Sequence, residues 1–169
     1  MKTLLFINGT MGAGKSTVCQ ALKRMIPPAV VLDGDWCWDA YPFTVTDETK
    51  AMVVDHICHL LNGFLHCSAY RNVIFGWVMD DPAVVDALRA RLDLRDVRFR
   101  LYTLTLTESA LRARLQADID AGRRTPDILD RSVARLPRYA RTDGVPIDVS
   151  AISAAEAAAR IAADVRNIW

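Results

Sequence analysis

The segment Gly9–Ser16 constrains the fold most, because it requires a strand before it and a helix after it. Its sequence, Gly-Thr-Met-Gly-Ala-Gly-Lys-Ser, fits the phosphate-binding pattern G-x-x-x-x-G-K-[ST] at every fixed position. Backbone N–H groups of such a loop converge on a phosphate, and the N-terminus of the following helix adds partial positive charge. The apolar run 3–7 precedes the loop, and apolar residues repeat at helical spacing from Val18 until Pro27. Both required elements are therefore predicted.

The loop pattern also predicts what its side chains bind. We expect Lys15 to reach the β- and γ-phosphates of a nucleoside triphosphate, and the Ser16 hydroxyl to be a ligand of Mg²⁺. The predicted nucleotide-binding residues of the loop are Gly9, Thr10, Met11, Gly12, Ala13, Gly14, Lys15, Ser16 and Thr17. ATP and Mg²⁺ are the expected cofactors, although the pattern does not distinguish ATP from GTP.

Length and composition indicate a chain that can bury a core without disulfides. Its 169 residues are interpreted as one domain, 1–169, of which 51% are hydrophobic and whose formal net charge is +1. So small a net charge argues against a general nucleic-acid or membrane-surface binder. Asn8 ends the first apolar run far below signal-peptide length, and no stretch is long enough to span a bilayer. We expect a cytoplasmic monomer or homodimer with four free cysteines.

Strand and helix patterns alternate through the rest of the chain, which predicts a doubly wound, three-layer α/β/α fold with a parallel sheet. A long helix is expected from Thr46, which is a plausible cap, and Pro146 suggests that the last strand lies at an edge. The remaining elements are expected as strands at 29–32, 73–79, 99–106 and 145–149, helices at 82–94 and 108–120, and a final alanine-rich helix.

Two carboxylates end the second predicted strand. In an open parallel sheet, ligands lie beyond the carboxyl ends of the strands, so Asp33 and Asp35 should approach the phosphate loop. Asp-Gly-Asp is also an ordinary polar turn. The aromatic residues that follow could either wall the pocket of a small-molecule acceptor or pack against the core, and they are Trp36, Trp38, Tyr41 and Phe43.

Charge is distributed unevenly along the chain. The stretch from Asp33 to Asp55 is acidic, whereas 13 arginines lie between Arg89 and Arg141. Guanidinium groups suit phosphate, so we predict that an arginine-rich lid around 118–136 closes over the nucleotide. Asp80 follows an apolar strand and is interpreted either as a carboxylate that holds Mg²⁺ through water or as the residue before a helix cap.

These motifs together resemble the P-loop kinases, the group that contains adenylate, shikimate and gluconate kinases and chloramphenicol phosphotransferase. The resemblance rests on the loop at Gly9–Ser16, on Asp33-Gly34-Asp35 and on the arginine-bearing segment before the last strand. It implies a five-stranded parallel sheet of order 2-3-1-4-5 and ATP-dependent phosphorylation of a small molecule. By similarity to shikimate kinase, it also implies that Asp33 belongs to the Mg²⁺ shell and that Asp35 faces the acceptor hydroxyl.

The same resemblance implies roles for lid arginines. The segment 135–139, Arg-Leu-Pro-Arg-Tyr, resembles the R-L-x-x-Y segment of nucleotide kinases, and Arg114 resembles their earlier lid arginine. A second arginine is expected four residues after Arg114, where this chain has Asp118. The residues predicted to act in transfer are Lys15, Asp35, Arg131 and Arg135, and Arg114 is predicted to contact the nucleotide.

Three functions are compatible with this sequence. The favoured one is an ATP-dependent phosphotransferase whose acceptor is a hydroxyl of a metabolite or an antibiotic, bound near Asp35, Trp36 and Trp38. A nucleoside or nucleotide kinase is the first alternative. A non-kinase ATPase or ATP-binding regulatory protein is the second, and the carboxylate pair beside an aromatic strip suits a pocket better than a protein surface.

Overall fold

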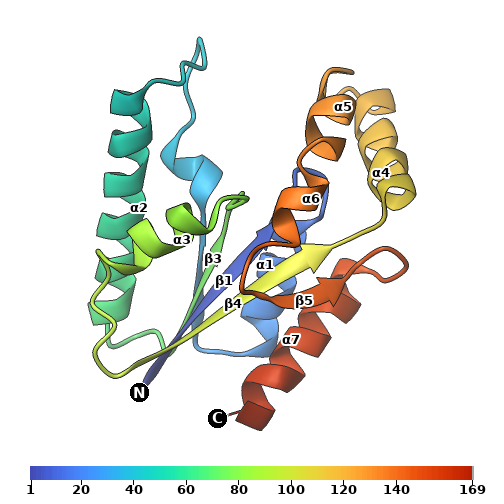
Figure 1. The fold of residues 1–169 in the computed structure, drawn as a ribbon. Helices are drawn as coiled ribbons and strands as arrows, with labels where there is room; N and C mark the ends of the chain where they lie inside the picture. Colours follow the sequence, from blue (N-terminus) through green and yellow to red (C-terminus); the bar gives the residue numbers. More distant parts are fainter. Residues whose placement is uncertain (169) are drawn as a thin grey trace.

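Five parallel strands form the centre of the computed structural model, which describes residues 1–168 (Figure 1). Their order across the sheet is β2-β3-β1-β4-β5, as the resemblance to P-loop kinases implied. The strands are β1 Lys2–Gly9, β2 Ala29–Asp33, β3 Asn72–Gly76, β4 Val97–Thr105 and β5 Val145–Asp148. The strand that contains Pro146 lies at an edge, where a missing backbone donor costs no ladder hydrogen bond.

The central strands are apolar because both faces of the sheet are covered. Every residue of β3 is buried, as is every residue of β1 after Lys2. In register, Phe6 of β1 lies between Phe75 of β3 and Leu101 of β4, and the Phe6 and Phe75 rings meet edge to face at 4.9 Å. Continuous apolar runs are what parallel strands buried on both faces require.

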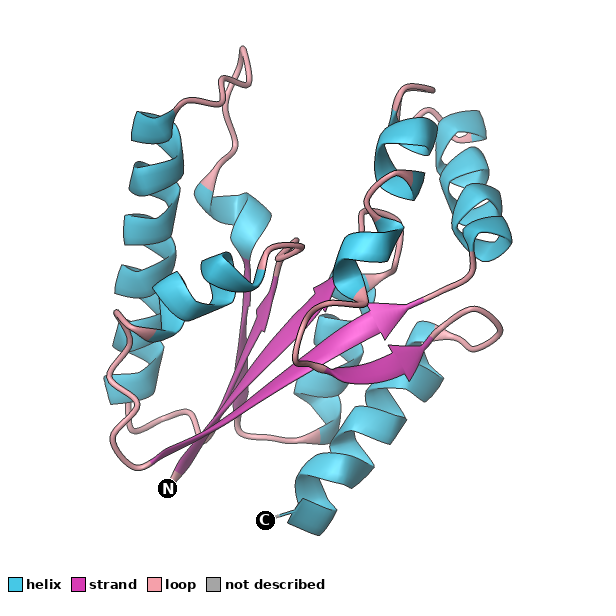
Figure 2. Cartoon of the chain, viewed as in Figure 1, coloured by secondary structure: helices cyan, strands magenta, loops and turns pink. Residues whose placement is uncertain are grey.

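Helices cover both faces of the sheet (Figure 2). Helices α1 (Lys15–Met25) and α7 (Ala154–Ile168) share one hydrophobic cluster with the sheet, whereas α2 (Asp47–His66) and α3 (Pro82–Arg89) contribute to a second cluster on the opposite face. Beyond the carboxyl ends of the strands lie α4 (Glu108–Asp120), α5 (Ile128–Val133) and α6 (Leu136–Tyr139). The short 3-10 helix η1 (Gly34–Cys37) continues directly from β2.

Capping side chains set two of the predicted helix starts. Thr46 accepts a hydrogen bond from the Thr49 backbone and forms a capping box with it at the start of α2. Asp81 caps α3 by accepting from the Ala83 backbone, with Pro82 in the first helical position. Both starts agree with the sequence prediction.

Two predicted elements are shorter than expected. The third strand ends at Gly76 rather than at Met79, because the Met79 backbone bonds to the Asn8 side chain instead of to a neighbouring strand. Helix α3 ends at Arg89 rather than at Leu94. In both cases the apolar pattern continues past the element because the residues that follow are still buried, Met79 and Leu92 among them.

The predicted lid region, 118–136, contains the short helix α5 and is followed by the short helix α6, and the sequence pattern indicated neither. Helices α4 and α5 form a third, small hydrophobic cluster around Leu111, Leu115 and Ile128. All four cysteines are free, as expected. Within residues 1–168, no helix combines the length and apolar character needed to cross a membrane.

Candidate nucleotide and phosphoryl-transfer site

The phosphate loop connects β1 to α1 through backbone conformations that favour glycine. Gly12 and Gly14 have φ angles of 85° and 92°. A Cβ atom on Gly12 would lie 2.7 Å from Cδ2 of Leu115, so the loop also packs directly beneath α4. The glycines therefore shape the loop and allow α4 to approach it.

Asn8 fixes the start of the loop. Its fully buried side chain donates to the Met79 carbonyl at 2.9 Å and accepts from the backbone N–H groups of Met79 and Gly9, both at 2.8 Å. All of these bonds are made in the protein interior, where an unpaired amide is costly. Asn8 thus joins the loop to the segment that follows β3.

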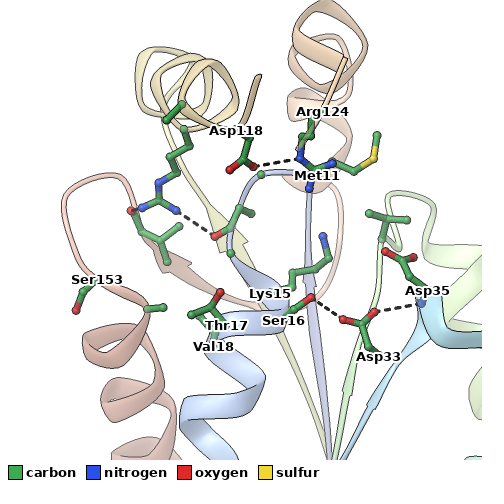
Figure 3. A pocket seen from close by; sticks show the side chains of 18 of the residues that line it. Met11, Lys15, Ser16, Thr17, Val18, Asp33, Asp35, Asp118, Arg124 and Ser153 are labelled. Carbon is green, nitrogen blue, oxygen red and sulfur yellow. Dashed lines mark hydrogen bonds and ion pairs between the residues drawn. The ribbon is translucent and has the colours of Figure 1, made fainter. Parts of the chain in front are cut away.

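Lys15 extends from the first turn of α1 back across the loop (Figure 3). Its ammonium donates to the carbonyl groups of Gly9 at 2.9 Å and Thr10 at 3.0 Å. Burial lowers the pKa of Lys15 to about 8, and the nearby carboxylates of Asp35 and Asp33 oppose that shift without cancelling it. An ammonium in this position is stabilised by any anion that enters the loop.

Ser16, Asp33 and Asp35 form a connected group beside the loop. The Ser16 hydroxyl donates to Oδ2 of Asp33 at 2.5 Å, and Oδ1 of Asp33 accepts from the Asp35 backbone at 3.1 Å. Asp33 ends β2 and caps η1, which places the Asp35 side chain at the same end of the sheet. Asp-Gly-Asp is therefore a capping turn, as one sequence interpretation proposed, and it also brings two carboxylates to the phosphate loop.

A cavity of about 590 Å³ contains most of the predicted nucleotide-site residues. Gly9 and Thr10 lie behind it, and they contribute to the site through the carbonyl groups that bind Lys15. Its lining brings together the loop, both carboxylates, α4 and the start of α7, and the residues concerned are Met11, Gly12, Ala13, Gly14, Lys15, Ser16, Thr17, Val18, Asp33, Asp35, Val78, Arg114, Ala117, Asp118, Arg124, Val149, Ile152, Ser153 and Ala154.

Arg114 lines this cavity, but its guanidinium is bonded to the backbone. It donates to the carbonyl groups of Ala13 at 3.1 Å, Ile152 at 3.4 Å and Val149. These bonds tie the phosphate loop to the segment between β5 and α7. The geometry gives Arg114 a part in shaping the cavity, with the guanidinium facing carbonyl oxygens.

Asp118 occupies the position where the resemblance led us to expect an arginine. Its carboxylate accepts from Arg123 at 2.8 Å and from Arg124 at 3.1 Å, and the two ion pairs lower its pKa. Arg124 is thereby held at the wall of the cavity, as Figure 3 shows. A cation therefore still lines the candidate nucleotide site, but it comes from Arg124 in the loop after α4 and not from the helix itself.

The two lid arginines that were predicted to act in transfer lie outside the cavity lining. Arg131 lies 3.6 Å from Asp127, one turn away. Arg135 lies 3.8 Å from the Asp80 carboxylate, and Arg138 lies 3.4 Å from it. The Asp80 side chain is 16% exposed and pairs with these two arginines. Asp80 also directly precedes Asp81, the cap of α3, as one sequence interpretation proposed.

The predicted aromatic wall is divided between the interior and the surface. Trp38 packs against the α2 side of the sheet and meets the Phe43 ring at 4.8 Å. Trp36 is 62% exposed and Tyr41 is fully exposed. Trp36 follows Asp35 directly in η1, and none of these rings lines the nucleotide cavity.

Comparison with known proteins identifies the family. Residues 5–135 match the family model described as an AAA domain. The chain belongs to this AAA domain family. No curated protein sequence shows a significant match to it.

Solved structures show which fold this AAA domain chain shares. A gluconokinase from Sinorhizobium meliloti 1021 aligns with a TM-score of 0.67 at 20% identity, covering 98% of this chain and 96% of the other. The tunicamycin resistance protein of Deinococcus radiodurans aligns at 0.70 and 20% identity, with the same coverage. The APS kinase of Mycobacterium tuberculosis, solved with AMPPNP and APS, aligns at 0.69 and 16%, covering 98% of each chain. The AAA domain chain therefore has the P-loop kinase fold that its motifs predicted.

Several site residues of this AAA domain chain escaped the sequence interpretation. Asn8 carried no signal beyond its place before the loop. Arg124 was one of many lid arginines, and only the position of Asp118 distinguishes it. Ile152 and Ser153 follow the last strand, and they reach the cavity because the segment before α7 turns toward the phosphate loop.

Proposed function

We propose that this protein transfers the γ-phosphoryl group of ATP to a hydroxyl of a small molecule, either a metabolite or an antibiotic. The observation that carries the proposal is the bonded group formed by Ser16, Asp33 and Asp35 beside Lys15 at one cavity. A bare ATP-binding site needs the loop, its lysine and its serine. A second carboxylate at the mouth of the site is what an alcohol acceptor requires.

The cavity fits a nucleotide in size and charge. Its volume of about 590 Å³ is within the range of small-molecule sites. Lys15 and Arg124 both line the cavity and supply positive charge, and the α1 N-terminus adds its dipole. We assign the β- and γ-phosphates to the loop and to Lys15.

The hydroxyl of Ser16 and the carboxylate of Asp33 fit Mg²⁺, which prefers hard oxygen ligands and needs only a few from the protein. Bound there, Mg²⁺ would neutralise charge on the phosphate oxygens. The Ser16–Asp33 hydrogen bond supports this assignment, because it already holds the two oxygen ligands next to each other.

Asp35 acts on the acceptor. Its carboxylate orients the acceptor hydroxyl in line with the γ-phosphorus and accepts its proton. As the new bond between acceptor oxygen and phosphorus forms, the bond between phosphorus and the β–γ bridging oxygen breaks, and ADP leaves with that oxygen. Lys15 stabilises the charge that develops on the transferring group.

The fold neighbours support a small acceptor. They are a gluconokinase, an APS kinase and a tunicamycin resistance protein, and they cover nearly the whole of this chain. Their names refer to small molecules, which favours a metabolite or an antibiotic over a protein partner.

A coupled assay of ADP release tests the proposal. The purified protein with Mg-ATP is mixed with a library of metabolites, nucleosides, nucleotides and antibiotics, and acceptors are those compounds that accelerate ADP release. Asp35→Asn should retain ATP affinity and lose transfer by about two to four orders of magnitude. Asp86→Asn, an exposed change on α3, is the matched control and should transfer normally. ATP hydrolysis that no compound accelerates would favour the ATPase or regulatory alternative.

A further inference from the structure

We propose that the acceptor carries no negative charge and has an apolar ring, so that it is a neutral or cationic ring-bearing alcohol. The inference rests on the proposed function, because it concerns the surface on which an acceptor next to Asp35 would lie. That surface comprises η1, the segment 38–46, the first turn of α2 and the segment 77–81, and we call it the acceptor wall.

Carboxylates dominate the acceptor wall. Lys50 is the only lysine or arginine between Gly34 and Tyr70 in the sequence, and its ammonium lies 3.3 Å from Asp47. The acidic side chains of the wall are Asp35, Asp39, Asp47, Glu48, Asp80 and Asp81. An anionic substituent on the acceptor would meet several like charges here and no free cation from η1 or α2. Repulsion of this kind excludes wrong ligands, and specific sites use it together with attraction to the right ones.

The lid compensates for only part of this charge. The five arginines between 123 and 138 each lie within 4.0 Å of a carboxylate, and their partners are Asp118 for two of them, Asp127 for one and Asp80 for two. Transfer already requires cations for the phosphates of ATP. Asp80, on the wall itself, offsets only one of the two positive charges of Arg135 and Arg138. With these two arginines and Lys50 counted, the six carboxylates of the wall still leave it a net charge of −3.

Exposed apolar side chains are concentrated in the same segment. Of the eight large hydrophobic side chains that are exposed within the described part of the chain, four belong to it, and they are Trp36, Tyr41, Phe43 and Val45. Trp36 is adjacent to Asp35, and Trp77 packs closely on Gly34. Aromatic faces beside a carboxylate suit a ring-bearing ligand and also attract a cation.

The position of Trp36 favours a small ligand over a protein as the occupant. It shares the four-residue helix η1 with Asp35, so the exposed ring lies within one residue of the carboxylate that the acceptor hydroxyl would meet. The negative charge of the wall therefore predicts a ligand without negative charge, and the exposed rings predict that the same ligand contains an apolar ring.

Sets of matched alcohols test the inference. Each set shares one ring and one hydroxyl, and its three members carry a carboxylate, a carboxamide or an amine elsewhere. ADP release is measured for each member at saturating Mg-ATP. We expect kcat/KM for the amide or amine member to exceed that of the carboxylate by about tenfold or more, as a difference of a few like charges predicts. A carboxylate that equals or exceeds its partners would overturn the inference and leave the transferase proposal standing.

A complete failure of acceptance has a different meaning. If no member of any set accelerates ADP release but a compound of the wider library without such a ring does, the inference fails and the transferase proposal stands. If ATP binds and neither the sets nor the library accelerate ADP release, the transferase proposal fails and the inference fails with it. Trp36→Ala supplies the second measurement: it should raise KM for the ring-bearing acceptor about tenfold, the scale of one lost stacking contact, and leave the Kd of ATP unchanged. Met25→Ala, an exposed apolar change at the far end of α1, is its control. Equal KM values for Trp36→Ala and wild type would exclude the aromatic contact.

Discussion

ATP binding should take up a proton when the solution is alkaline, because Lys15 has a lowered pKa in the nucleotide-free protein. Burial holds that pKa at about 8. Phosphate oxygens next to the ammonium favour its charged form and raise the pKa again. At pH 7 the lysine is already charged and little proton uptake is expected, whereas at pH 9 about nine molecules in ten must gain a proton as ATP binds.

The same shift determines how the affinity depends on pH. The charged fraction of free Lys15 falls about tenfold between pH 7 and pH 9, so the apparent affinity for ATP should fall by about the same factor. Water in the cavity weakens the shift, so about tenfold is an upper value. Phosphate groups are fully ionised in this range and contribute little.

Titration calorimetry in two buffers of different ionisation enthalpy measures the uptake directly. Lys15→Met should bind ATP more weakly and show no uptake at either pH. Equal binding enthalpies of wild type in the two buffers at pH 9 would refute the lowered pKa.

Thermal unfolding without ATP should show the opposite dependence. The Lys15 pKa is about 8 in the folded protein and 10.5 in the unfolded chain, so the folded protein loses this proton at a lower pH. Lys15 therefore increases the stability of the fold as pH rises above about 8. Burial raises the pKa of the neighbouring Cys19 thiol to about 12, and ionisation of that thiol in the unfolded chain from about pH 9 offsets the gain from Lys15. The trend reverses only above the unfolded lysine pKa of 10.5. Burial also raises the pKa of the Cys37 and Cys58 thiols, so the Lys15 contribution is isolated by comparison with Lys15→Met, which keeps all the thiols and should lose the rise.

Three substitutions test other parts of the site. Asp33→Asn should raise the Mg²⁺ concentration for half-maximal activity by about tenfold or more, measured by Mg²⁺ titration of ADP release, and an unchanged requirement would remove Asp33 from the metal shell. Arg135→Ala should lower kcat by about tenfold or more with little change in the Kd of ATP, because the phosphoryl group that the arginine would contact gains charge in the transition state. A normal kcat would mean that the R-L-x-x-Y similarity is misleading. Gly12→Ala should destabilise the fold by about 1–3 kcal/mol in denaturant titration, because φ is 85° and the new methyl meets Leu115; stability equal to wild type would contradict this packing.

Local chemistry made the central part of the fold predictable. The run 3–7 is buried on both faces and so carries no polar interruption, and the loop after it has glycine where φ is positive. Thr46 and Asp81 mark helix starts because their side chains bond to the backbone only a few residues away. Interactions of this range are encoded in neighbouring residues, so the sequence alone was sufficient to identify them.

The lid was less predictable because its structure depends on distant contacts. Helices α5 and α6 are six and four residues long, too short to be stable through propensity, and α5 is held by packing on α4 and by the bond from Thr10 to the Ser132 carbonyl at 3.3 Å. The partners of Arg135 and Arg138 also lie far away in the sequence, at Asp80. No periodicity within 118–139 indicates any of these contacts.

The replacement of an expected arginine by Asp118 shows why charge should be counted in space and not along a motif. If only the sequence position is compared, Asp118 puts a negative charge on α4 where the motif has the positive charge of an arginine. In the structure it holds Arg123 and Arg124, so the three side chains together keep one net positive charge, as a single arginine would. The carboxylate also fixes where that charge lies, because Arg124 is at the cavity wall while Arg123 is more exposed. A departure from the motif is therefore compatible with an unchanged electrostatic role, and substitution of Asp118 affects the nucleotide site through Arg124.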